Sequence, residues 1–141
     1  MIRKSEINKN DYRLTAINRH NLHYLYLCLN EIRAEWKRPM IIKSGIRSRD
    51  EHIQIYRTIN TQRATEGKPP LFPPMGSAHL KAAAVDVYDP KHELYDFINS
   101  NWDLWESLDL DIYMEHRDFT ESWTHIQTTP TRSGNRIFIP Y

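Results

Sequence analysis

The sequence lacks several features that define specialised classes of protein. Its single cysteine, Cys28, has no partner in the chain, so no disulfide framework forms, and we expect a small buried hydrophobe rather than a nucleophile. No apolar run reaches the roughly 18 residues that a membrane span requires, and we expect no membrane partner. The N-terminal segment is positively charged but has no apolar stretch behind it. We therefore expect no secretion signal and a protein that is cytoplasmic on synthesis.

An excess of charge of one sign is also lacking. The chain has 19 lysines and arginines against 18 aspartates and glutamates, which gives a formal net charge of +1. Such a balance provides no basic field for sequence-independent nucleic-acid binding, so we expect no nucleic-acid partner. The 141 residues, 40% of them hydrophobic, contain no repeat, low-complexity tract or linker. This composition fits one globular domain over residues 1–141, and we expect a monomer.

Apolar spacing in the first half of the chain predicts two helices and a strand. The first helix spans about four turns, ends before Pro39, and buries apolar residues that recur at spacings of three and four: Leu22, Leu25, Leu29, Ile32 and Trp36. Residues 39–44 form a short apolar run that is typical of a buried strand. Ser48 followed by Glu51 has the spacing of a capping box, which predicts a second helix over 49–60.

The second half of the chain combines a long loop, strands and one helix. Residues 60–76 have no periodicity and contain four prolines, so we expect a loop at the rim of the functional site. Residues 82–88 alternate, and in that strand Asp86 lies on the face opposite to the apolar one. A helix is predicted over 91–108. Two strands are predicted over 110–115 and 122–128, joined by a short polar turn. An irregular or edge segment is predicted over 132–141.

Two histidines and an aspartate form the candidate site. His79 is followed seven positions later by Asp86, and His125 lies near the C-terminus. Two neutral imidazoles, one carboxylate and a fourth position for water make up the ligand set of a catalytic zinc. Residues 82–84 are all alanine, so only small side chains lie between His79 and Asp86. The chain must reverse its direction there if both side chains are to reach one ion. The same residues also allow an alternative without metal: a surface loop histidine, a hydrogen-bonded core aspartate and a histidine on a strand face.

Three ordered motifs over residues 41–127 carry a family resemblance. They are Ser44-Gly45-Ile46-Arg47-Ser48, then Ser77-x-His79-x-x-Ala82-x-Ala84-x-Asp86, then Trp123-x-His125. Together they resemble the zinc D-alanyl-D-alanine carboxypeptidase family, which includes D,D-dipeptidases and phage L-alanyl-D-glutamate endolysins, and the C-terminal segment resembles the short phage members. The resemblance implies an α+β fold of the D,D-peptidase and hedgehog type. It also implies a small antiparallel sheet flanked by helices, with Zn²⁺ held on the sheet face by His79, Asp86 and His125.

The chain departs from the family pattern at two positions. Family members usually have glycine where this chain has Ala82. They also carry a catalytic carboxylate three residues before the last histidine, where this chain has Ser122. We expect the general base to be Glu115 or Glu121, and favour Glu115 because short phage members carry an acidic residue at that place. Glu121 lies four residues before His125 and would share its face on a continuous strand.

Two further residues match family positions near the substrate. Arg47 has a planar fork of donors and is suited to stabilise an oxyanion or to clamp a substrate carboxylate, while the alternative is a solvated residue before a helix. Ser77 resembles a position that supports substrate near the metal, and its alternative is a simple loop hydroxyl.

The activity that the resemblance implies is hydrolysis of the stem peptides of bacterial peptidoglycan by a zinc metallopeptidase. The enzyme would be of D-Ala-D-Ala carboxypeptidase or L-Ala-D-Glu endopeptidase type, acting on the cell wall after release from the cytoplasm or as part of a virion. Two other functions stay open. One is a non-catalytic, zinc-containing phage structural or wall-binding module, which the serine at position 122 favours. The other is a D,D-dipeptidase that acts on small dipeptides.

Overall fold

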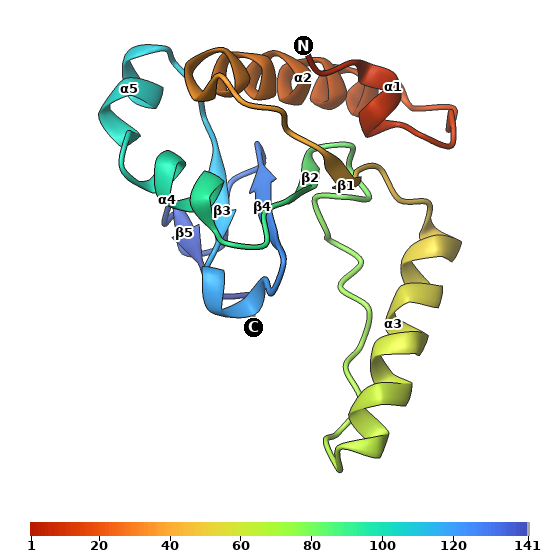
Figure 1. Ribbon diagram of the computed structural model, residues 1–141. Coiled ribbons are helices and arrows are strands. Elements are labelled where there is room, and N and C mark those ends of the chain that lie inside the picture. Colours follow the sequence, from red (N-terminus) through yellow and green to blue (C-terminus); the bar gives the residue numbers. More distant parts are fainter. Residues whose placement is uncertain (141) are drawn as a thin grey trace.

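A five-stranded mixed sheet forms the centre of the computed structural model, which describes residues 1–140 (Figure 1). The strand order is β1-β2-β4-β3-β5. The strands span Ile42–Ser44 (β1), Ala84–Tyr88 (β2), Tyr113–Glu115 (β3), Trp123–Gln127 (β4) and Ile137–Phe138 (β5). Together with its helices the sheet makes an α+β fold, as expected.

The sheet is not purely antiparallel, so that part of the expectation is wrong. The pairs β1–β2, β2–β4 and β3–β4 are antiparallel, whereas β3 and β5 are parallel. The reason is the path of residues 128–136, which connect β4 to β5. They place β5 beside β3, at the edge of β3 that does not pair with β4. There β5 runs opposite to β4 and hence in the same direction as β3. The backbone N–H groups of Met114 and His116 donate to Arg136 and Phe138 at 2.7 and 2.8 Å.

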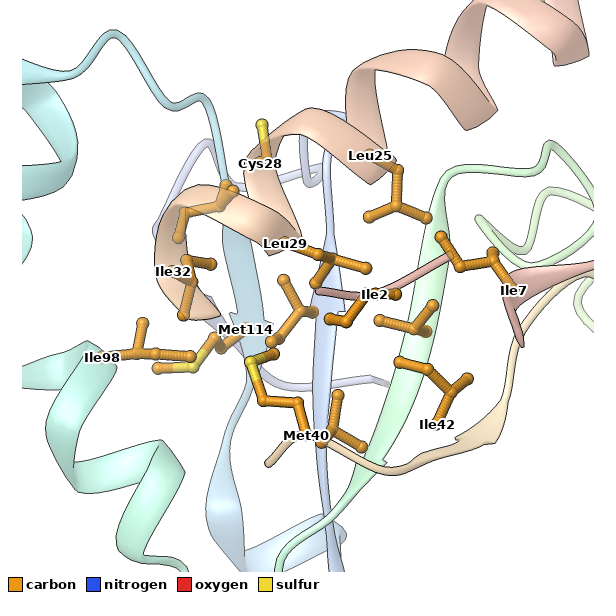
Figure 2. Close-up of a cluster of buried hydrophobic side chains, with 14 of the residues drawn as sticks. Ile2, Ile7, Leu25, Cys28, Leu29, Ile32, Met40, Ile42, Ile98 and Met114 are labelled. Atoms are coloured by element: carbon orange, nitrogen blue, oxygen red, sulfur yellow. The ribbon is translucent and has the colours of Figure 1, made fainter. Parts of the chain in front are cut away.

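One long helix, α2 (Ala16–Trp36), covers the apolar face of the sheet and buries the core. Figure 2 shows Leu25, Leu29 and Ile32 of this helix directed toward the strands. The predicted helix is confirmed, and it begins earlier because the hydroxyl of Thr15 caps it by accepting from the N–H of Asn18 at 3.2 Å.

The lone cysteine lies within this core. Cys28 of α2 is 1% exposed, as expected for a small buried hydrophobe. Burial raises the pKa of its thiol to about 11. The sulfur therefore stays protonated at neutral pH and is a poor nucleophile.

The N-terminal segment also belongs to the core, which the polar sequence there did not indicate. It forms a short helix, α1 (Lys4–Ile7), and both Ile2, which precedes this helix, and Ile7, its last residue, are buried. The side chain of Asn30 in α2 holds the backbone of Ile2, accepting from its N–H at 2.8 Å and donating to its carbonyl at 3.1 Å.

The second long helix, α3 (Arg49–Thr65), extends away from the sheet (Figure 1). It begins where the sequence predicts, because the hydroxyl of Ser48 accepts from the N–H of Glu51 at 3.1 Å. It continues past residue 60, so the first part of the predicted loop is helical. The rest of that loop returns beside the helix, held by paired hydrogen bonds of 2.8 and 2.7 Å between the Asn60 amide and the backbone of Leu71.

The single helix predicted over 91–108 is wrong. The structure has two short helices, α4 (Glu93–Asn99) and α5 (Trp102–Ser107). The side chain of Asn101 donates to the carbonyl of Phe97 at 2.7 Å and ends α4. The break lets Trp105 enter the core, where it is fully buried and its indole N–H donates to the carbonyl of Ile98 at 3.0 Å.

A one-turn helix, η1 (Arg117–Phe119), forms the predicted polar turn between β3 and β4. Among residues 1–140, no helix is both long enough and apolar enough to cross a membrane.

Gly45 allows a close approach between the N-terminal segment and the end of β1. The N–H of Ile46 donates to the carbonyl of Ile7 at 2.9 Å, and a Cβ atom on Gly45 would lie only 2.1 Å from that carbonyl oxygen. A backbone atom cannot yield as a flexible side chain does, so only glycine fits here.

Replacing Gly45 with alanine should therefore lower the free energy of unfolding by about 1–3 kcal/mol, as overpacking does. Chemical denaturation of the purified protein measures this. Gly76→Ala is the matched control, because a Cβ atom there would meet no atom within 4 Å. Equal stability of the two variants would contradict the packing described here.

Candidate metal centre

A row of side chains crosses the face of the sheet that points away from α2. Val85 and Val87 belong to the hydrophobic core, so Asp86, between them in β2, points to the opposite face. Asp86 lies opposite His125 of β4 and opposite Ser44 of β1. Strand register alone therefore brings these three side chains together.

The row continues on the other side of His125. The pair Met114 and Ile126 sets the register of β3 and β4, and one residue further along that antiparallel register Glu115 comes opposite His125. Glu115 pairs in turn with Phe138 of β5, whose ring centre lies 5.8 Å from that of His125. Opposite residues on neighbouring strands have Cβ atoms about 4.5–5.5 Å apart. Glu115 thus belongs to the same site.

His79 lies outside the strands and reaches the row from the end of the long return segment. Its Nδ1 is 2.8 Å from the carbonyl oxygen of Gly45, and its own carbonyl accepts from the N–H of Arg47 at 3.2 Å. A backbone carbonyl only accepts, so the hydrogen of the neutral imidazole is on Nδ1. The lone pair of His79 is therefore on Nε2, which faces Asp86 at 3.4 Å.

Ala82, three residues after His79, has an unusual backbone conformation. Ala82 is fully buried and has a φ angle of 58°, in the left-handed region. Glycine adopts this conformation without steric cost, whereas an alanine there is strained by about 1–2 kcal/mol. A glycine at position 82 would remove this strain.

The three expected ligands form one buried cluster. His79, Asp86 and His125 are 4, 8 and 8% exposed, and their potential ligand atoms all lie within 4.8 Å of one another. The Oδ1 atom of Asp86 is 2.9 Å from Nδ1 of His125. A zinc ion bound at about 2.0–2.2 Å places tetrahedral ligands roughly 3.4 Å apart, so the cluster fits a metal ion of this kind.

Arg47 occupies the other side of the Asp86 carboxylate. Its guanidinium is 3.4 Å from Oδ2 of Asp86, and its Nε donates to the hydroxyl of Ser44 at 3.3 Å. The Arg47 side chain is only 14% exposed, so it is not a freely solvated residue before a helix. Asp86 therefore directs Oδ1 to the two histidines and Oδ2 to the guanidinium of Arg47. These contacts fix the orientation of the carboxylate, as hydrogen bonds do for carboxylates that bind metal ions.

Electrostatics at the cluster favour a cation. Burial raises the pKa of Asp86, but the imidazoles of His79 and His125 outweigh burial and hold that pKa well below its ordinary value. Burial lowers the pKa of His79, which leaves a neutral ring at pH 7. Burial also lowers the pKa of His125, but the hydrogen bond and the charge of Asp86 raise it by more. A metal ion bound to His125 would therefore compete with a proton.

The two glutamates considered as general base lie in different places. Glu115 is partly buried, and burial raises its pKa, with His125 opposing that shift and Asp86 adding to it. Glu121 is exposed and precedes β4, which begins at Trp123, so it does not share a continuous strand with His125. The structure brings Glu115, and not Glu121, into the row of the candidate ligands.

The two serines of interest both make local contacts. The hydroxyl of Ser77 accepts from the N–H of His79 at 3.3 Å and so supports the turn that carries this histidine. Ser122 accepts from the ammonium group of Lys43 at 3.3 Å, beside the ring of Trp123.

Sequence reasoning missed two groups that contact the histidine rings. One is the carbonyl of Gly45, which no side-chain pattern could indicate. The other is the side chain of Gln127, whose Oε1 is 2.8 Å from Nε2 of His125. Its position two residues after a strand histidine is a signal that could have found it.

No protein-family model, curated protein or solved structure matches this chain.

One zinc ion per chain should bind to the purified protein, and His79→Ala or Asp86→Ala should remove most of it, because each change takes away one of three ligands. Elemental analysis after dialysis measures the zinc content. His23→Ala and Asp103→Ala, both at exposed positions, are the matched controls. Full zinc retention in the His79 or Asp86 variant would refute the assignment of ligands.

Zinc affinity should rise with pH. Because the pKa of His125 is raised, this ring is still protonated when the pH is near or below the ordinary pKa of a histidine. Zinc must displace that proton. Below the pKa of His125 the affinity should fall about tenfold per pH unit. Calorimetry in two buffers of different ionisation enthalpy should detect the released proton. An affinity that does not change between about pH 5.5 and 7.5 would contradict the raised pKa.

Proposed function

We propose that this chain is a zinc-dependent peptidase that hydrolyses the stem peptides of bacterial peptidoglycan. The observation that carries the proposal is the row of Asp86, His125 and Glu115 on one sheet face, with His79 completing a ligand set beside it. Three protein ligands leave one position open, which is the mark of catalytic rather than structural zinc sites. The substrate class is supported by the three ordered motifs that resemble the zinc D-alanyl-D-alanine carboxypeptidase family.

The side chains around the ligands are suited to peptide hydrolysis. A zinc ion in such a site supplies Lewis acidity toward a peptide carbonyl and lowers the pKa of water. Glu115 accepts a proton from the attacking water and returns it to the leaving amine, and its raised pKa makes it a stronger base. The guanidinium of Arg47 offers a planar fork of donors to an oxyanion or to a substrate carboxylate.

Ser77 has a smaller part in the proposed site. Its hydroxyl supports the turn that carries His79, through a bond of 3.3 Å, and we place it beside bound substrate. The proposed enzyme acts on the cell wall, after release from the cytoplasm or as part of a virion. The bond it cleaves is of the D-Ala-D-Ala or the L-Ala-D-Glu type.

Digestion of purified peptidoglycan, with mass spectrometry of the released termini, tests the activity. The zinc-loaded protein should release new termini, and Glu115→Gln should reduce the rate by about 10²–10⁴-fold while it retains zinc and fold, because an amide cannot accept the proton. Glu121→Gln is the matched control and should have little effect. The reverse pattern would move the role of base to Glu121, and undiminished activity in both variants would exclude a glutamate base.

A second candidate function is a non-catalytic module that binds zinc and serves in a phage particle or in wall binding. The observation that favours it is Ser122, which stands where family members have the catalytic acid and contacts Lys43 instead. A zinc-loaded protein that releases no termini from any wall type, yet sediments with intact peptidoglycan, would support this candidate over the peptidase.

A further inference from the structure

Gln127 is a buried polar side chain on the face of the candidate site that the proposed chemistry does not use. It follows His125 by two residues in β4, so both side chains point to the same face of the sheet. Only 8% of Gln127 is exposed. Its neighbours on the adjacent strands are Ala84 and Tyr113. A buried amide needs partners for both of its ends, and the structure provides them.

Backbone contacts fix the orientation of this amide. The Nε2 group of Gln127 donates to the carbonyl oxygen of Thr129 at 2.8 Å, and it also lies 3.5 Å from the hydroxyl of that residue. The carbonyl oxygen has no hydrogen to donate, so the NH₂ end of the amide must face Thr129. The amide oxygen, Oε1, must then face Nε2 of His125, 2.8 Å away.

The amide oxygen in turn fixes the ring of His125. An amide oxygen only accepts, so Nε2 of His125 carries a hydrogen and donates it to Gln127. The other ring nitrogen, Nδ1, is 2.9 Å from Oδ1 of Asp86, inside the ligand cluster. We propose that Gln127 is a positioning residue that holds His125 in one tautomer and orientation, so that Nδ1 is its metal-binding atom.

The two histidines of the cluster are thereby held in opposite ways. His79 donates from Nδ1 to the carbonyl of Gly45 and turns Nε2 to the cluster, whereas His125 donates from Nε2 and turns Nδ1 to it. Ligating histidines usually donate their second ring N–H to such a partner, and loss of the partner weakens metal binding. The inference rests on the proposed zinc site and does not depend on the proposed peptidase activity.

Zinc affinity of the whole chain, measured by competition with a chromophoric chelator, tests the role of Gln127. Gln127→Leu keeps a similar volume but has no acceptor, and it should bind zinc about 10–100-fold more weakly. Gln127→Glu restores an acceptor oxygen and should bind within a few-fold of wild type. Gln54→Leu, the same change at an exposed position of α3, is the matched control and should have no effect.

A second measurement keeps the inference testable if the leucine variant does not fold. Long-range ¹H–¹⁵N correlation spectra of the zinc-loaded wild-type protein should show a hydrogen on Nε2 of His125 and zinc on Nδ1. A hydrogen on Nδ1 would overturn the inference, as would wild-type zinc affinity in a folded Gln127→Leu variant. Tight zinc binding without hydrolysis would instead count against the peptidase and leave the role of Gln127 intact.

Discussion

The buried carboxylate of Asp86 is the group on which the candidate site depends. A buried charge is costly unless it is paired and hydrogen-bonded. Here Nδ1 of His125 at 2.9 Å and the guanidinium of Arg47 at 3.4 Å provide partners, while Nε2 of His79 turns its lone pair toward the same carboxylate at 3.4 Å. Each contact joins a different part of the chain to β2. The segment between β1 and α3, the long return segment and β4 therefore converge on a single side chain.

The alternation of β2 and β4 separates this polar cluster from the core. Val85 and Ile126 point toward α2 and are fully buried among apolar residues, while Asp86 and His125 point to the other face. The stability of the fold thus comes from one face and the proposed chemistry from the other. A sheet with this division can hold a buried ionised group without placing it in the hydrophobic core.

The resemblance of the motifs predicted which three side chains form the ligand cluster, and the alternation of β2 and β4 fixes the side of the sheet on which Asp86 and His125 lie. Other features depend on contacts that no local pattern contains. The side chain of Asn101 makes the break between α4 and α5 that lets Trp105 enter the core, although helical periodicity continues across it. The parallel direction of Ile137–Phe138 depends on the path of the preceding loop, since two residues have no period. The role inferred for Gln127 depends on the orientation of an amide.

A crystal structure of the zinc-loaded protein, with anomalous scattering data collected on both sides of the zinc absorption edge, tests the proposed metal centre most sharply. We expect one strong anomalous peak per chain, bonded to Nε2 of His79, Nδ1 of His125 and Oδ1 of Asp86 at about 2.0–2.2 Å. We also expect a fourth position that is open to solvent and lies beside Glu115. A peak at other residues, or a fourth ligand from the protein itself, would rule out a catalytic metal centre at His79, Asp86 and His125.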